Sequence, residues 1–83
     1  MFFHIGGEIL VPKRDLVAII DLNKNGSSKV TKEFLEVAAS EGNIVETKDK
    51  EGKYKSCIIT INKIYLSSIS ATTLNKRIQN MSF

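Results

Sequence analysis

The sequence predicts a small single domain of the α+β class, with an antiparallel-rich sheet and two helices. Three observations lead to this prediction: apolar residues gather in short runs, turn-forming residues separate the runs, and helical apolar spacing occurs only twice. The 83 residues suffice for one domain, 1–83, with 79–83 expected to fray. Because a chain this short buries only about 60–65% of its unfolded surface, self-association is an expected source of stability.

The N-terminal segment predicts a β-hairpin. Residues 2–5 and 8–11 are mainly apolar, and the Gly6-Gly7 pair between them is typical of a tight turn. Pro12 is expected to end the second run, because proline has no N–H to donate to a strand ladder. We therefore expect two short paired strands at the start of the chain.

The next segments predict a buried strand and the longest helix. Residues 16–22 are almost continuously apolar, which indicates a buried strand, and residues 23–27 contain an Asn-Gly turn signal. Helical apolar spacing then predicts a helix over residues 29–41, with Gly42 just beyond its end. The face of this helix that is expected to pack inward holds Val30, Phe34, Val37 and Ala38.

The C-terminal half predicts a second hairpin, a further strand and a second helix. Residues 44–48 and 53–61 are expected to pair across a charged turn, and residues 64–66 form the further strand. Ser70 is expected to cap a helix over residues 71–79. The expected order is therefore β-β-β-α-β-β-β-α. The expected core holds Ile5, Leu10, Leu16, Val17, Ile19, Ile20, Val30, Phe34, Val37, Ile44, Ile58, Ile59, Ile61, Leu66 and Leu74.

Charge and hydropathy narrow the class of protein. The net charge of +3 is a mild excess that permits nucleic-acid binding without requiring it. The longest apolar run, residues 16–20, is far shorter than the roughly 20 residues of a membrane span, and the start of the chain does not resemble a signal peptide. We expect a cytoplasmic protein without membrane contact, in which the single cysteine, Cys57, is a buried hydrophobic residue.

The sequence offers no catalytic constellation. His4 is the only histidine, and one imidazole makes neither a metal site nor a catalytic triad without partners supplied by the fold. The glycines match neither the Walker pattern nor the dinucleotide-binding fingerprint. We therefore expect no enzyme activity, no metal and no cofactor.

Basic residues near turns are the remaining candidates for function. Lys13 and Arg14 close the first hairpin, and several lysines surround Tyr54 in the second. Cations beside an aromatic ring can hold a phosphate backbone by neutralising its charge and by stacking. Acidic residues share the second hairpin and cancel much of its charge, so a solvated mixed-charge turn and a phosphate-binding tip both stay open.

The order and spacing of the segments resemble a known family. The stretches that carry the resemblance are Ile5-Gly6-Gly7, Ile9-Leu10-Val11, Leu16-Val17-Ala18-Ile19, the helix from Val30 to Ala39, Glu51-Gly52-Lys53, Ile64-Tyr65-Leu66-Ser67-Ser68-Ile69-Ser70 and Thr72-Thr73-Leu74-Asn75-Lys76-Arg77. Together they are similar to the RemA and RemB family of bacterial extracellular-matrix regulators, and most similar in layout to its RemB branch. The similarity spans nearly the whole chain and rests on order, spacing and length.

This resemblance implies a DNA-binding transcriptional regulator of extracellular-matrix and biofilm genes that acts as a ring or other symmetric homo-oligomer. Each subunit would add a few cations, and multivalency would supply the affinity for double-stranded DNA. The DNA contacts suggested by the resemblance and the basic pattern are Arg14, Lys53, Tyr54 and Lys55. The residues expected at the subunit interface are Phe2, Phe3 and Tyr65.

The chain departs from the RemA pattern at the implied DNA contacts. One arginine position of RemA falls on Asp15, and an arginine cluster falls on Lys53, Tyr54 and Ser56. Lysine is a poorer match than arginine for bidentate phosphate contact, and aspartate repels phosphate. The alternative is a protein-interaction module of the same fold that does not bind DNA and associates with a RemA-like relative.

Overall fold

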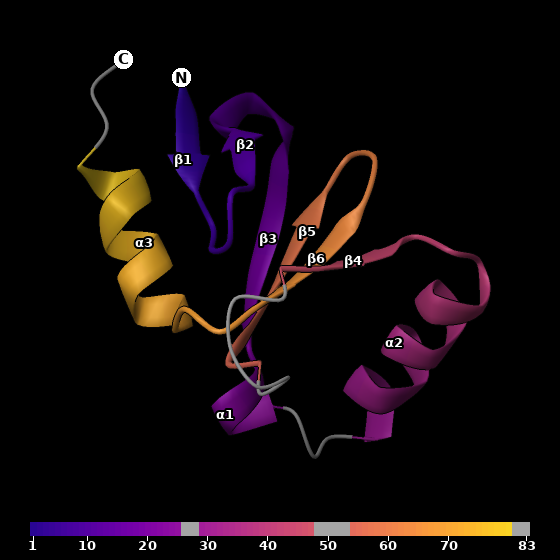
Figure 1. Ribbon diagram of the computed structural model, residues 1–83. Coiled ribbons are helices and arrows are strands. Elements are labelled where there is room, and N and C mark those ends of the chain that lie inside the picture. Colours follow the sequence, from indigo (N-terminus) through magenta and orange to yellow (C-terminus); the bar gives the residue numbers. More distant parts are fainter. Residues whose placement is uncertain (26–28, 48–53, 81–83) are drawn as a thin grey trace.

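The computed structural model describes residues 1–25, 29–47 and 54–80 and confirms an α+β fold rich in antiparallel pairing (Figure 1). Its strands are β1 (Phe2–His4), β2 (Leu10–Pro12), β3 (Leu16–Asp21), β4 (Ile44–Glu46), β5 (Ser56–Thr60) and β6 (Ile64–Ser67). Its helices are the 3-10 helix η1 (Lys13–Asp15), α1 (Leu22–Asn25), α2 (Lys29–Ser40) and α3 (Ala71–Gln79). The expected order is confirmed, with two additional single turns of helix, η1 and α1.

The N-terminal hairpin forms as expected. β1 and β2 pair antiparallel, with Phe3 opposite Val11, and β2 ends at Pro12. The turn contains two glycines with positive φ, +116° at Gly6 and +57° at Gly7, a backbone region that glycine enters at little cost.

The main sheet has the strand order β3-β5-β6-β4. The expected hairpin between residues 44–48 and 53–61 is wrong, because β4 pairs in parallel with β6, with Ile44 opposite Ile64. β5 lies in the middle of the sheet and pairs antiparallel with β3 on one side and β6 on the other. Alternation of apolar residues along a strand predicts which face of the strand is apolar, but it does not predict which strands pair. The first three residues of β5 are buried, which agrees with the central position of this strand in the sheet.

The two faces of this sheet carry separate apolar clusters. On one face, Phe3 and Val11 of the hairpin and Leu74 of α3 pack on Ile58. On the other face, Ala38 of α2 packs with Cys57 and Ile64. The sheet therefore lies between a layer formed by the hairpin with α3 and a layer formed by α2, as Figure 1 shows.

β3 forms as a strand, but the prediction that it is buried is wrong. It lies at the edge of the sheet, and its register shifts between Leu16 and Ala18. Val17 consequently has 63% of its surface exposed, and Ala18 is exposed too. The apolar run over residues 16–20 therefore belongs to an edge strand whose first half packs against the protein on one face only. Leu10 and Ile61, also expected in the core, are exposed: Leu10 is the first residue of β2, and Ile61 lies in the turn after β5.

Helix α2 is confirmed, but its expected inner face is not. The helix ends before Gly42, where φ is +74° and the Gly42 N–H donates to the Ala39 carbonyl. Of the stripe expected to pack inward, only Ala38 is buried, whereas Val30, Phe34 and Val37 are 75%, 39% and 58% exposed. Leu35, outside the expected stripe, packs against the core instead. The apolar stripe is present, but most of it is exposed in the described part of the chain.

Helix α3 has the range, the N-cap and the buried face that the sequence predicts. The Ser70 side chain accepts a hydrogen bond from the Thr73 N–H at 3.2 Å, so Ser70 is the N-cap. Leu74 is fully buried and Ile78 packs partly against the same cluster. Near its end, the Arg77 guanidinium donates to the His4 carbonyl at 2.7 Å, which ties the helix to the hairpin.

Two further expectations differ from the structure. Phe3 was expected at a subunit interface, but it is 3% exposed, because it forms part of the core under α3. Residues 23–27 were expected as a turn, whereas Leu22–Asn25 form the single turn of α1 and residues 26–28 lie outside the described ranges. None of the helices in the described part of the chain has the length and apolarity needed to cross a membrane.

Candidate nucleic-acid interface

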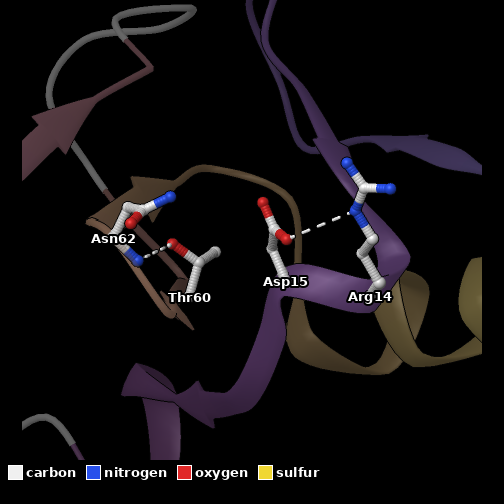
Figure 2. Close-up of polar contacts among 4 residues, drawn as sticks. All are labelled: Arg14, Asp15, Thr60 and Asn62. Atoms are coloured by element: carbon white, nitrogen blue, oxygen red, sulfur yellow. Dashed lines mark hydrogen bonds and ion pairs between the residues drawn. The ribbon is translucent and has the colours of Figure 1, made fainter.

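Arg14 lies in η1, the tight connection between the hairpin and the main sheet. Its side chain is 88% exposed, and its Nε lies 3.8 Å from an oxygen of Asp15 (Figure 2). An ion pair in water at this distance is worth well under about 1 kcal/mol, so it does not hold Arg14 away from a ligand. The arginine is available for phosphate, although Asp15 offsets part of its positive charge.

The turn between β5 and β6 packs beside η1. The Ile61 N–H donates to the Asp15 carbonyl at 3.0 Å, and the Thr60 hydroxyl closes the turn by donating to the Lys63 carbonyl at 2.7 Å. Figure 2 shows Asp15 between Arg14 and this turn. Lys63 is exposed in the turn and therefore joins Arg14 at this end of the sheet. The sequence predicts the turn, but only the fold shows that it lies next to η1.

Lys55 and Tyr54 lie where the chain enters β5. The Lys55 N–H donates to the Ser67 carbonyl at 2.8 Å, and the Lys55 carbonyl accepts from the Leu22 N–H at 3.0 Å. This fixes the Lys55 backbone on both sides, while its side chain is exposed and Tyr54 is partly buried. Lys53, the remaining predicted contact, lies outside the described residues.

Ser56, which matches one arginine position of the RemA pattern, is turned into the protein. It is fully buried, and its hydroxyl donates to the Ile69 carbonyl at 2.7 Å. A serine can make this internal hydrogen bond because it is short, and the bond leaves no surface for a ligand. Ser56 therefore offers no side chain to a ligand at the surface.

The structure separates Arg14 from Lys55. β3 and β5 are antiparallel, with Leu16 opposite Thr60 and Asp21 opposite Ser56. Arg14 precedes β3 and Lys55 precedes β5, so the two cations lie at opposite ends of the strand pair. A six-residue strand such as β3 spans about 20 Å. One chain therefore presents two separate basic positions, one at each end of the β3–β5 pair.

The described residues give little support for a metal site or for a reactive histidine or cysteine. In those ranges no group of three His, Cys, Asp or Glu side chains is arranged to hold a metal ion. His4 lies in the hairpin, where its Nε2 is 2.7 Å from the Gly7 carbonyl oxygen. Burial raises the pKa of the Cys57 thiol to about 11, which keeps it protonated and unreactive near neutral pH. The expectation that Cys57 is a buried hydrophobic residue is confirmed.

Comparison with known proteins identifies the family of this chain. The family model described as extracellular matrix regulatory protein A-like matches residues 2–78, so the chain belongs to the RemA-like family. Its sequence is 36% identical over 81 residues to extracellular matrix regulatory protein B of Bacillus subtilis (strain 168). This match covers 98% of the chain and 94% of the relative, and it confirms the similarity to the RemB branch.

Proposed function

We propose that this protein is a DNA-binding transcriptional regulator of extracellular-matrix genes that acts in the cytoplasm as a homo-oligomer. The observation that carries the proposal is the pair of exposed cations, Arg14 and Lys55, at the two ends of the β3–β5 pair. Their separation of about 20 Å corresponds to roughly six base-pair steps along the axis of a DNA duplex. Each subunit would thus hold the backbone at two separate points. Tyr54 would stack or pack beside Lys55, and Lys53 would add a further cation.

Self-association supplies the affinity that one subunit lacks. A net charge of +3 is small, but copies arranged symmetrically on one duplex add their phosphate contacts. The exposed stripe of α2, formed by Val30, Phe34 and Val37, supports this part of the proposal, because apolar side chains gathered on one helix face are typical of an interface.

A second candidate function is a protein-interaction module that does not bind DNA. The same α2 stripe favours it, since the stripe could pack against a RemA-like protein instead of a second copy. The carboxylate of Asp15 beside Arg14 also favours it, because this charge opposes phosphate. The two candidates differ in one property that can be measured directly, the affinity of the purified protein for DNA.

Fluorescence anisotropy of a labelled duplex, titrated with purified protein over a salt series, tests the proposal. We expect binding that weakens steeply as salt is raised, because each phosphate contact releases counterions. Lys55→Glu should abolish binding without changing the oligomer mass. Lys32→Glu, the same charge reversal at an exposed site on α2, should have a much smaller effect. Absence of binding even at low salt, together with co-purification of a RemA-like protein, would instead establish the interaction module.

A further inference from the structure

The turn of the N-terminal hairpin presses on the backbone at the end of β4. A Cβ atom placed on Gly7 would lie 2.6 Å from the Thr47 carbonyl oxygen, a distance too short for any side chain. Thr47 is 7% exposed, and its N–H donates to the Leu66 carbonyl at 3.1 Å. Because Thr47 is held on β6, it cannot move away from the turn easily. Only glycine at position 7 allows this contact.

The same turn is connected to Lys55 through Ser67. The Ser67 hydroxyl donates to the Ile5 carbonyl, just before the two glycines, and Ser67 is fully buried. Its carbonyl accepts the Lys55 N–H at 2.8 Å. The turn therefore contacts the chain at Thr47 directly and is linked to Lys55 through a single residue.

We propose that Gly7 is a positioning residue for the DNA contact made by Tyr54 and Lys55. The Thr47 N–H is bonded to the Leu66 carbonyl and the Lys55 N–H to the Ser67 carbonyl, so both are attached to neighbouring residues of β6. Both are held relative to the hairpin turn, so a displacement of the Thr47 carbonyl is transmitted to the backbone that carries the lysine. The inference rests on the proposed function and deepens it: a residue that contacts no DNA determines where one end of the DNA surface lies.

Gly42 provides a matched control for Gly7. Both glycines have positive φ, +57° and +74°, so an alanine meets a similar backbone penalty at either position. A Cβ on Gly42, however, meets no atom within 4 Å. The difference between Gly7→Ala and Gly42→Ala therefore isolates the contact with Thr47.

The test is the DNA affinity of the full chain carrying Gly7→Ala or Gly42→Ala, each also combined with Lys55→Ala and with Arg14→Ala. We expect Gly7→Ala to weaken binding about tenfold more than Gly42→Ala, the order of one charge-assisted contact. The magnitude of the slope of log K against log salt should fall by about 0.9 per subunit. The effect should disappear in the Lys55→Ala background and persist in the Arg14→Ala background.

Two outcomes overturn the inference while leaving the proposed function intact. One is equal DNA affinity of Gly7→Ala and Gly42→Ala, and the other is an undiminished Gly7→Ala effect in the Lys55→Ala background. Absence of DNA binding by the unsubstituted protein overturns the proposed function and the inference with it. If Gly7→Ala does not fold, Ser67→Ala serves instead, because it removes the hydrogen bond to Ile5. It should show the same dependence on Lys55.

Discussion

The separation of Arg14 and Lys55 predicts that their contributions to DNA binding are additive. Two unit charges about 20 Å apart interact by about 0.2 kcal/mol in water, and the Debye length of about 8 Å at physiological salt reduces this further. The residues also share no hydrogen-bond partner among the bonds described above. The double variant Arg14→Ala/Lys55→Ala should therefore lose the sum of the two single losses, within about 0.3–0.5 kcal/mol.

The assay is a double-mutant cycle measured by fluorescence anisotropy on one duplex at several salt concentrations. Each single substitution should reduce the magnitude of the salt slope by about 0.9 per subunit, and the double variant by about twice that. Lys32→Ala serves as the control for removal of an exposed lysine elsewhere. A coupling energy above about 1 kcal/mol would refute the reasoning, because residues that couple this strongly lie in contact or share a partner. Such a result would mean that Arg14 of one subunit meets Lys55 of another.

Three further predictions concern stability and assembly. Leu74→Ala should lower the free energy of unfolding by about 3–5 kcal/mol in urea titrations, because Leu74 is fully buried between α3 and the sheet; a loss below about 1 kcal/mol would contradict this packing. Val37→Asp should reduce the oligomer mass measured by light scattering and leave the circular dichroism spectrum unchanged, since Val37 is 58% exposed within one chain; an unchanged mass would exclude the α2 stripe as the interface. The pKa of Cys57 is raised from 9.0 to about 11, so the unfolded chain loses this proton first and stability should fall as pH rises from 9 to 11. Thermal melts of Cys57→Ala should lack this part of the pH dependence.

Local features of the fold could be predicted from the sequence because each depends on neighbouring residues. Ser70 caps α3 through the amide three positions further on, and Gly42 ends α2 because it adopts a positive φ. The Gly6-Gly7 turn and the end of β2 at Pro12 follow from backbone preferences of the same kind. The sequence also determined the family, since order and spacing of short segments survive without any diagnostic motif.

The tertiary structure alone decided how these segments meet. β4 joins β6 in parallel, Ser56 turns inward, and the stripe of α2 is largely exposed among the described residues, although each segment was predicted with the right type. In the same way, only the fold places Arg14 and Lys55, both predicted as DNA contacts, at opposite ends of a strand pair. Strand partners, register and burial depend on contacts between residues far apart in the chain. Periodicity and capping act over a few residues, so they specify an element and its apolar face but not the surface that covers it.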